Sequence, residues 1–288
     1  MLIVCPTPIG NLSDITARQR DALSAAEIIA CEDTRETGKL LERLGIVRVD
    51  GVPALVSYHE HNEQARVSSL VAALQQGKRV VLVSDAGTPA ISDPGFRLVR
   101  AAVEAGLAIT ALPGPVAAMV ALSASGLPTD RFFFEGFLPS KQGARRKRLS
   151  VLDALGVSVV LYESPHRVIV LLEDVVEVLG AQREVCVARE LTKLHEEYLR
   201  GTADAVRSTL SARERVRGEF VVILGPRVDE DPAAAEEREE AIDSKILELL
   251  EEGMRPRGIK EVVSALFGLA KSEIYERIER IDQGRSKP

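Results

Sequence analysis

Short apolar runs alternate with amphipathic segments along the first 225 residues of the chain. The runs have the length and the β-branched composition of buried strands, and they cover residues 2–5, 27–31, 79–84, 107–112, 157–162, 184–188 and 218–225. The segments between them have helical periodicity, and Ser13 and Asn62 stand where two of the helices should begin. Four glycines stand where helices should end: Gly45, Gly77, Gly106 and Gly180. The alternation predicts an α/β fold with parallel-rich sheets covered by helices on both faces.

The alternation is interrupted at "SGLPTDRFFFEGFLPSKQG", where turn residues surround an aromatic cluster. We therefore expect an N-terminal α/β domain at residues 1–125 and a second α/β domain at 126–226. The acidic stretch 227–240 contains alanine and proline and is typical of a linker. Residues 241–288 have helical periodicity and predict a small helical C-terminal domain, whose balanced charge favours a packing role over contact with nucleic acid.

The net charge of −6 is misleading, because the segment from Asp229 to Glu240 carries seven acidic residues and one arginine. The remainder of the chain is neutral, so the acidic balance says nothing against an anionic partner. The segment "SKQGARRKRLS" has the opposite sign: it is basic and contains no acidic residue. This segment is a candidate for contact with phosphates, with a solvated helix face as the alternative.

The expected compartment is the cytoplasm. No apolar run reaches the roughly 20 residues that a membrane helix needs, so we expect no membrane association. The N-terminus "MLIVCPTPIG" lacks a basic region and a long apolar region, and it is interpreted as a first strand. Cys5, Cys31 and Cys186 lie scattered in strand-like runs, which is typical of buried thiols and of neither disulfides nor a metal site.

Three loops rich in proline and glycine follow predicted strands: "CPTPIGN", "SDAGTPAISDPG" and "LPGPVAA". In an open α/β sheet, ligands bind beyond the carboxyl ends of the strands, and small residues allow the backbone to approach a ligand closely. None of the loops matches the phosphate-binding P-loop, the dinucleotide fingerprint or the nucleophile elbow. We therefore expect a ligand that is not held through phosphates by a lysine.

Polar residues follow other strands. "ACEDTRET" places Glu32, Asp33 and Arg35 at the mouth of the same crevice, with helix capping by Asp33 or Thr34 as the alternative. In "SYHEHNE" the histidines are two residues apart, which does not fit the known zinc spacings on a helix, so a polar rim or a solvated loop is expected there.

Two further strand ends carry candidate chemistry. "YESPHR" contains Glu163 and His166, and "RELTK" contains Glu190 and Lys193. For the second segment, a strand-to-strand turn with an exposed salt bridge is an open alternative.

Taken together and in this order along the chain, the segments "CPTPIGNLSDITARQRDAL", "CEDTRETGKLL", "VSYHEHNE", "VLVSDAGTPAISDPG", "LPGPVAAMVALSASGLPTDRFFFEGFLP", "YESPHR" and "RELTK" resemble the ribosomal RNA small subunit methyltransferase I family. The resemblance implies a tetrapyrrole methylase-like fold (a class III methyltransferase), with two α/β domains and the donor site between them. It implies S-adenosylmethionine as the methyl donor and 16S rRNA, or the small ribosomal subunit, as the partner. The expected acceptor is the ribose 2′-hydroxyl of a cytidine in the decoding region, and the expected oligomer is a homodimer.

Carried over by position, the resemblance implies a set of donor-binding residues: Pro8, Ile9, Gly10, Asp85, Gly87, Thr88, Ala90, Ile91, Val116, Ala117 and Tyr162. Loops without lysine suit this donor, because a sulfonium is cationic and carries no phosphate. For catalysis, Glu190 or His166 is the candidate base, and Lys193 is the candidate that stabilises the alkoxide. The candidate RNA contacts are Lys141, Arg145, Arg146, Lys147 and Arg148.

Two other functions stay open. Within the fold, the chain could methylate a small tetrapyrrole precursor, although the basic segment and the helical tail argue against this. Outside the class, the tail could mark a ligand-sensing, nucleic-acid-binding regulator, which the balanced charge of the tail disfavours.

Overall fold

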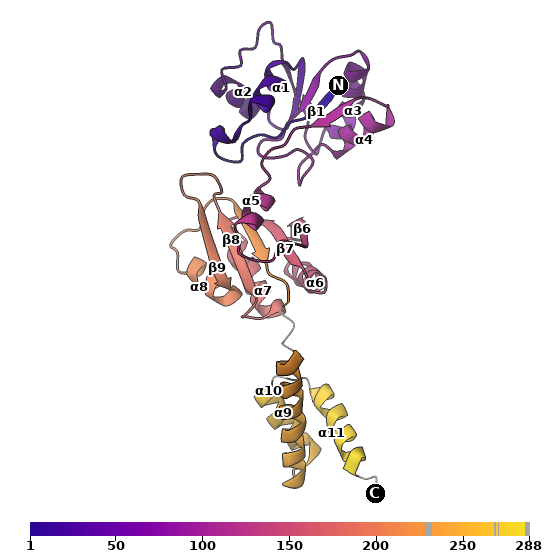
Figure 1. Cartoon of the computed structure of the whole chain (residues 1–288), viewed down its shortest axis with the longest axis vertical. Coiled ribbons are helices and arrows are strands. Elements are labelled where there is room, and N and C mark those ends of the chain that lie inside the picture. Colours follow the sequence, from indigo (N-terminus) through magenta and orange to yellow (C-terminus); the bar gives the residue numbers. More distant parts are fainter. Residues whose placement is uncertain (228–231, 268, 270, 286–288) are drawn as a thin grey trace. The chain divides into compact units, whose positions relative to one another are not determined.

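The computed structural model describes residues 1–227, 232–267, 269 and 271–285 (Figure 1). Contacts along the chain divide it into one unit at Met1–Arg227 and another at Val228–Pro288. The first unit contains two five-stranded sheets, each with its own helices.

The first sheet is parallel throughout. Its strands are β1 (Leu2–Val4), β2 (Ile28–Cys31), β3 (Ala54–Ser57), β4 (Val80–Leu82) and β5 (Ile109–Ala111), in the order β3-β2-β4-β1-β5. The predicted parallel sheet is therefore confirmed here, with β3 as an additional edge strand. Because all five strands run the same way, the loops that follow them meet at one edge of the sheet.

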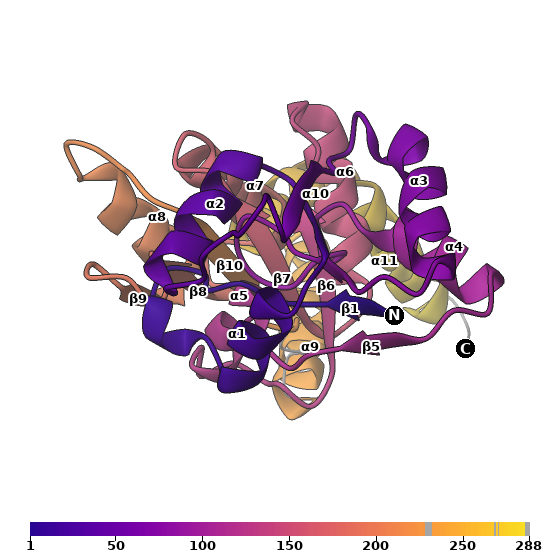
Figure 2. The same cartoon turned by 90° about the horizontal axis from the view of Figure 1, so that it is seen from above.

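Helices cover both faces of this sheet (Figure 2). A short 3-10 helix (Leu12–Asp14), α1 (Ala17–Ser24) and α2 (Thr34–Arg43) belong to one side, where Leu23 and Leu41 pack with Ile29. On the other side lie α3 (Glu63–Gln75) and α4 (Phe96–Glu104), where Leu70 and Leu98 pack with alternate strand residues.

The helix boundaries follow the sequence signals in part. The four glycines predicted to end helices do follow the ends of α2, α3, α4 and α7, and all four have positive φ. Ser13, in contrast, does not cap α1: Thr16 does, because its hydroxyl accepts from the Gln19 amide while the Gln19 side chain accepts from the Thr16 amide. Asn62 stands at the N-cap of α3, but its side-chain oxygen accepts from the His59 amide instead.

The second sheet is mostly antiparallel. Its strands are β6 (Phe132–Phe137), β7 (Ser158–Glu163), β8 (Glu184–Arg189), β9 (Glu197–Thr202) and β10 (Phe220–Leu224), in the order β6-β7-β10-β8-β9. Only the β6–β7 pair is parallel. The parallel-rich prediction is wrong for this sheet, because the short turn between β8 and β9 can join only antiparallel strands.

One face of the second sheet is covered by α6 (Gln142–Asp153), α7 (Val168–Leu179) and α8 (Ala203–Ser211). Helix α5 (Ala117–Ser123) covers the opposite face, where Ala121 and Leu122 share a core with Val160 and Ile223 (Figure 1). Residues 117–123 thus pack on the second sheet, although the sequence assigns them to the first domain. The α/β boundary at 125 does not follow this packing.

The unit Val228–Pro288 contains α9 (Pro232–Glu251), α10 (Pro256–Phe267) and α11 (Lys271–Arg285). Its core is aliphatic and includes Ile246, Ile259 and Ile274. Helix α9 begins inside the stretch 227–240 that the sequence predicts as a linker, of which residues 228–231 lie outside the described residues. Among the described helices, none has the length and apolar character to cross a membrane.

Candidate active site

The three loops of small residues are bound to one another at the carboxyl edge of the first sheet. The Thr7 amide donates to the Gly87 carbonyl at 2.9 Å, and the Gly87 amide donates to the Thr7 carbonyl at 3.0 Å. The Thr88 hydroxyl donates to the Pro115 carbonyl at 2.9 Å, which joins the second loop to the third. The predicted meeting of the loops is therefore confirmed, and they form one continuous wall.

Glycine is required where two of these loops approach each other most closely. A Cβ at Gly114 would lie 2.3 Å from Cβ of Pro6, so any side chain would push the third loop away from the first. In the second loop, Ala90 and Ser92 have φ of 69° and 59°, a conformation that non-glycine residues rarely adopt. Strained backbone of this kind is concentrated at ligand sites.

A cavity of about 360 Å³, called here the apolar pocket, lies between these loops and the second sheet. The loops contribute Ile9, Ala86, Gly87, Thr88, Ile91, Ser92, Asp93, Val116 and Ala117. The second sheet and its connections contribute Phe137, Tyr162, Glu163, Ser164, Pro165, Leu191, Glu219, Phe220 and Val221. Both halves of the first unit are therefore needed to form this pocket.

Most of the predicted donor-binding residues line this pocket: Ile9, Gly87, Thr88, Ile91, Val116, Ala117 and Tyr162. Pro8, Gly10 and Asp85 instead line a neighbouring cavity. Ala90 lines neither cavity and lies within the strained loop, where its amide donates to Pro94 at 3.3 Å.

The charged side chains that line the apolar pocket are all acidic: Asp93, Glu163 and Glu219, and no lysine, arginine or histidine is among its lining residues, all of which are described. Burial, followed by the negative charges of Glu32 and Asp85, raises the pKa of Asp93 to about 6. A cation in this pocket would therefore meet carboxylates, of which Glu163 is paired with Arg167 and Glu219 with Lys193 outside the lining.

Glu163 lines the apolar pocket, and one of its carboxylate oxygens accepts no hydrogen bond within the described part of the chain. Its side chain is fully buried, and Oε1 accepts from the Ser164 amide at 2.8 Å. Oε2 lies 3.3 Å from a guanidinium nitrogen of Arg167, but it accepts no hydrogen bond from any described residue. A buried carboxylate oxygen without a donor is an expected partner for a ligand.

Tyr162 connects the second sheet to α5. Its hydroxyl oxygen accepts from the Ala118 amide at 3.2 Å, and its ring makes edge contacts with Phe134 and Phe137 at centroid distances of 5.2 and 5.7 Å. Burial raises the pKa of Tyr162, so the hydroxyl stays neutral. Tyr162 therefore forms a fixed aromatic wall of the pocket.

The sequence-based site omits the contribution of β10. In the antiparallel pairing of β7 with β10, Phe220 lies opposite Glu163 and Val221 opposite Tyr162. This register places Phe220 and Val221 in the pocket, and no local signal in the sequence gives it. Asp93 could have been included, because it lies in the same loop as Asp85.

A second cavity of about 300 Å³, called here the polar pocket, adjoins the first. It is lined by Thr7, Pro8, Ile9, Gly10, Leu12, Glu36, Thr37, Lys39, Leu40, Arg43, Ser84, Asp85, Ala86, Lys193 and Glu219. Ile9, Ala86 and Glu219 line both pockets. The two cavities are therefore contiguous, and a group at their junction can contact ligands in each.

Lys193 and Glu190 form an ion pair beside this junction. Lys193 Nζ donates to Glu190 Oε1 at 2.9 Å and to Glu219 Oε2 at 3.0 Å. Partial burial acts to lower the pKa of Lys193, but the hydrogen bonds to both carboxylates outweigh it and the pKa is raised. Partial burial acts to raise the pKa of Glu190, but the hydrogen bonds from Lys193 and from the Glu219 amide leave it lowered. At neutral pH, Lys193 is a cation and Glu190 an anion.

The backbone that carries this pair is strained, with φ of 51° at Glu190 and 64° at Thr192. It also lies against the first loop, because a Cβ at Gly10 would be 2.5 Å from Cγ of Lys193. His166, the third catalytic candidate, is exposed and lines neither pocket.

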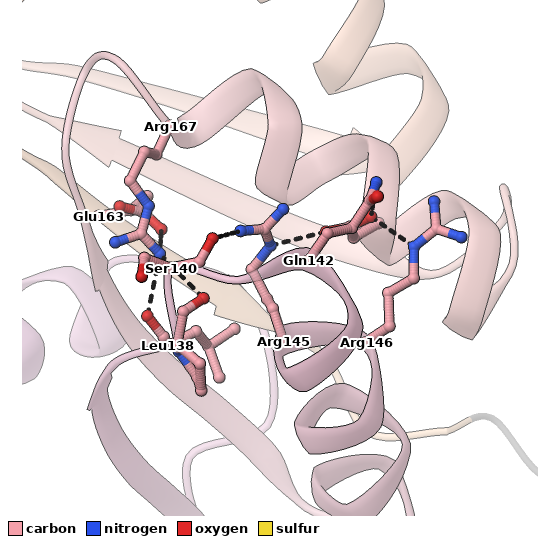
Figure 3. A network of polar contacts seen from close by, with 9 residues as sticks. Leu138, Ser140, Gln142, Arg145, Arg146, Glu163 and Arg167 are labelled. Carbon is pink, nitrogen blue, oxygen red and sulfur yellow. Dashed lines mark hydrogen bonds and ion pairs between the residues drawn. The ribbon is translucent and has the colours of Figure 1, made fainter.

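The basic segment is largely occupied by ion pairs within the protein (Figure 3). Arg145 is only 3% exposed and donates to the buried Asp174 at 2.6 Å, and Arg146 donates to the same carboxylate at 2.7 Å. Arg148 forms two hydrogen bonds with Glu135. Arg145 is therefore wrong as an RNA contact, because its guanidinium is enclosed and already neutralised. Lys141 and Lys147 are exposed.

Asp33 caps α2, as the capping alternative predicts. Its carboxylate accepts from the Arg35 amide at 2.8 Å and pairs with the Arg35 guanidinium. The Asp33 amide in turn donates to Asp85 at 3.0 Å, which fixes Asp85 toward α2 and away from the apolar pocket.

Known proteins share this fold. Residues 1–207 match the family model described as Tetrapyrrole (Corrin/Porphyrin) Methylases. The solved structure of the methyltransferase CobJ is similar with a TM-score of 0.57 and 22% identity, covering 80% of this chain and 95% of that one. Uroporphyrin-III C-methyl transferase from Thermus thermophilus, complexed with S-adenyl homocysteine, gives a TM-score of 0.53 at 16% identity, covering 78% and 96%. The chain thus has the fold of the tetrapyrrole methylases.

Relatives with more similar sequences show which family of methyltransferases the chain belongs to. A protein of Micromonospora olivasterospora is 41% identical over 288 residues, covering 100% of this chain and 88% of its own length. A protein of Escherichia coli O157:H7 is 43% identical, covering 96% of this chain and 93% of its own length. Both are named Ribosomal RNA small subunit methyltransferase I. The chain belongs to the ribosomal RNA small subunit methyltransferase I family.

Proposed function

We propose that this protein transfers a methyl group from S-adenosylmethionine to the ribose 2′-hydroxyl of a cytidine in the decoding region of 16S rRNA. The names of the relatives support ribosomal RNA as the acceptor. The observation that supports S-adenosylmethionine as the donor is the lining of the apolar pocket. Its charged residues are Asp93, Glu163 and Glu219, which are all acidic. A sulfonium donor is cationic and lacks phosphates, so it fits carboxylates and needs no lysine.

The lining residues divide naturally between the parts of such a donor. Asp93 would hold its cationic groups, together with Glu163 Oε2, which accepts no hydrogen bond from a described residue although it is ion-paired with Arg167. Val116, Tyr162 and Phe220 offer apolar and aromatic surface to a nucleobase. The bound donor supplies an activated methyl group, whose bond to sulfur breaks as the bond to the acceptor oxygen forms, leaving S-adenosylhomocysteine.

The residues at the junction act on the acceptor hydroxyl. A ribose hydroxyl is a weak nucleophile until its proton leaves, so a nearby cation that stabilises the oxyanion accelerates the step. Lys193 is kept protonated beside the junction and fits this role. Glu219 lines both pockets, and one of its carboxylate oxygens accepts from Lys193. Its exposed carboxylate would receive the hydroxyl proton. Glu190 is better suited to position Lys193 than to act as the base, because its pKa is lowered.

The same proposal includes the RNA contacts, the oligomeric state and the cellular location. Lys141 and Lys147 are the members of the basic segment that would meet RNA phosphates, since they are exposed. We propose a homodimer on the resemblance to the family. A cytoplasmic location fits the three free cysteines.

Titration calorimetry with S-adenosylmethionine, followed by methyl transfer onto small ribosomal subunits that lack the modification, tests this function. We expect 1:1 donor binding per chain and incorporation of methyl groups at a ribose of the decoding region. Donor binding with transfer only to a small tetrapyrrole precursor would overturn the RNA assignment. Absence of donor binding would overturn the proposal as a whole.

A further inference from the structure

The polar pocket is the space from which an acceptor can reach the donor pocket. Ile9, Ala86 and Glu219 line both cavities, so a ligand in one is in contact with the wall of the other. The lining of the polar pocket contains Asp85, Ser84 and Thr7. The two hydroxyls already donate to backbone carbonyls and can still accept, and Asp85 accepts from the Asp33 amide through one oxygen, which leaves its other oxygen for a ligand. A nucleoside fits such a lining, because its hydroxyl and amino groups form hydrogen bonds with these groups.

Helix α2 gives this pocket a row of side chains along one face. Glu36, Lys39, Leu40 and Arg43 all line it, and residues three and four apart are neighbours on the surface of a helix. Lys39 and Arg43 are therefore successive cations, one helical turn apart, leading away from the junction with the apolar pocket.

These cations are available to an anionic ligand. Lys39 pairs with Glu36 at 2.7 Å, but this pair is solvent-exposed and such pairs contribute little. Arg43 is exposed and forms no ion pair with any described residue. Basic helix α6 differs, since Arg145, Arg146 and Arg148 are held by carboxylates.

The row continues beyond α2. Arg43 also lines an open cavity of about 700 Å³, whose lining includes Arg20 of α1. Arg20 is exposed and likewise has no ion pair among the described residues. Arg43 thus lines both the polar pocket and this open cavity, and Lys39, Arg43 and Arg20 are three exposed cations along the two, with Asp21 as the acidic residue in the open cavity.

We infer that the polar pocket receives the acceptor ribose and that Lys39, Arg43 and Arg20 bind the phosphates of the RNA strand on one side of it. This inference rests on the proposed methyl transfer to RNA. It moves the main phosphate contact from α6, where the sequence places it, to α1 and α2 of the first sheet.

The test uses the full-length double variant Arg20→Ala/Arg43→Ala and compares it with Arg66→Ala/Arg100→Ala. The control residues are exposed arginines on α3 and α4, outside both pockets, so both variants lose the same charge. We expect the first variant to raise KM for small subunits roughly tenfold. The salt dependence of its binding should fall by about 0.7 to 0.9 log units per log unit of salt for each phosphate that is no longer neutralised. The dissociation constant for S-adenosylmethionine should be unchanged in both.

Equal KM and equal salt dependence in the two variants would overturn this inference while leaving the proposed function intact. If the wild-type protein fails to methylate small subunits at all, the proposed function falls, and the inference falls with it. These outcomes are distinguishable, because the first requires an active wild-type protein.

A second measurement locates the RNA strand directly. Lys39→Cys can be labelled with a photoreactive thiol reagent, because burial raises the pKa of Cys5 to about 12 and of Cys31 to about 11 and keeps these thiols unreactive. Burial raises the pKa of Cys186 as well. We expect crosslinks within a few nucleotides of the methylated cytidine, and none there from Arg66→Cys. Crosslinks near the cytidine from Arg66→Cys alone would contradict the inference.

Discussion

Lys193 and Glu190 are bound to each other at 2.9 Å, at the point where the two cavities meet. The same Glu190 oxygen accepts from the Glu219 amide at 3.0 Å, so this oxygen is already engaged while the ammonium still faces the polar pocket. This arrangement makes Lys193 a fixed positive charge beside the polar pocket and leaves Glu190 poorly suited to act as a base.

Lys193→Ala should reduce kcat for methyl transfer by about 100-fold or more, because the charge that stabilises the oxyanion is lost. Donor affinity should stay within about twofold of the wild type, since Lys193 does not line the apolar pocket. Lys193→Arg, which keeps the charge, should restore part of the rate. Rapid-quench measurement of the first turnover checks this, and a normal single-turnover rate in Lys193→Ala would contradict the role.

Glu190→Gln should lower kcat less than Lys193→Ala does, roughly tenfold, because it removes the partner that positions Lys193. If Glu190 were the base, the rate would instead fall as far as in the lysine variant, and the acidic limb of the pH–rate profile would disappear. His166→Ala serves as the matched control: the side chain is exposed and outside both pockets, so its kinetics should be those of the wild type.

Donor affinity should fall as the pH drops through about 6. Burial raises the pKa of Asp93 to about 6, so below that pH the carboxyl becomes neutral and attracts a cation less. Asp93→Asn should bind the donor more weakly at pH 7.5 and lose most of this pH dependence, as titration calorimetry between pH 5 and 8 can measure. Asp85→Asn is the comparison, because Asp85 lines the polar pocket and its effect on donor affinity should be smaller.

The same pKa shift affects stability without donor. A carboxyl whose folded pKa is raised binds protons more readily in the folded state, so it stabilises the fold at low pH. That contribution is lost as the pH rises from about 4 to about 6. Asp93→Asn should therefore have a higher melting temperature than the wild type at pH 7. A lower melting temperature would show that Asp93 is stabilised by a partner in the folded protein.

Arg145→Met should destabilise the fold by about 3 kcal/mol, because it leaves the buried Asp174 short of a charge partner. Lys147→Met, on the exposed face of the same helix, should change the free energy of unfolding by less than about 0.5 kcal/mol. Urea denaturation measures both. Equal free energies of unfolding would mean that the ion pair of Arg145 does not stabilise the fold, and Arg145 would again be a candidate RNA contact.

Sequence patterns predicted the first sheet and the meeting of its three loops well, because each loop carries its own signal of small residues after a strand. Patterns failed where partners come from distant segments. The pairing of Phe220 with Glu163, which completes the apolar pocket, depends on the register of an antiparallel sheet. The enclosure of Arg145 depends on Asp174, 29 residues further along the chain.

The sequence also could not predict that the candidate site is divided into two cavities. Asp85 and Gly87 are two residues apart in one loop, yet Asp85 lines the polar pocket and Gly87 the apolar pocket. The hydrogen bond from the Asp33 amide holds Asp85 at the polar pocket. The two backbone hydrogen bonds between Thr7 and Gly87 hold Gly87 at the apolar pocket.

The most direct test of the account is a map of ribose 2′-O-methyl groups on 16S rRNA from cells with the gene, without it, and with Lys193→Ala as the only copy. We predict one methylated cytidine in the decoding region that is present with the wild-type gene, absent without it, and absent or strongly reduced with the variant. An unchanged methylation map across the three strains would contradict the proposed function.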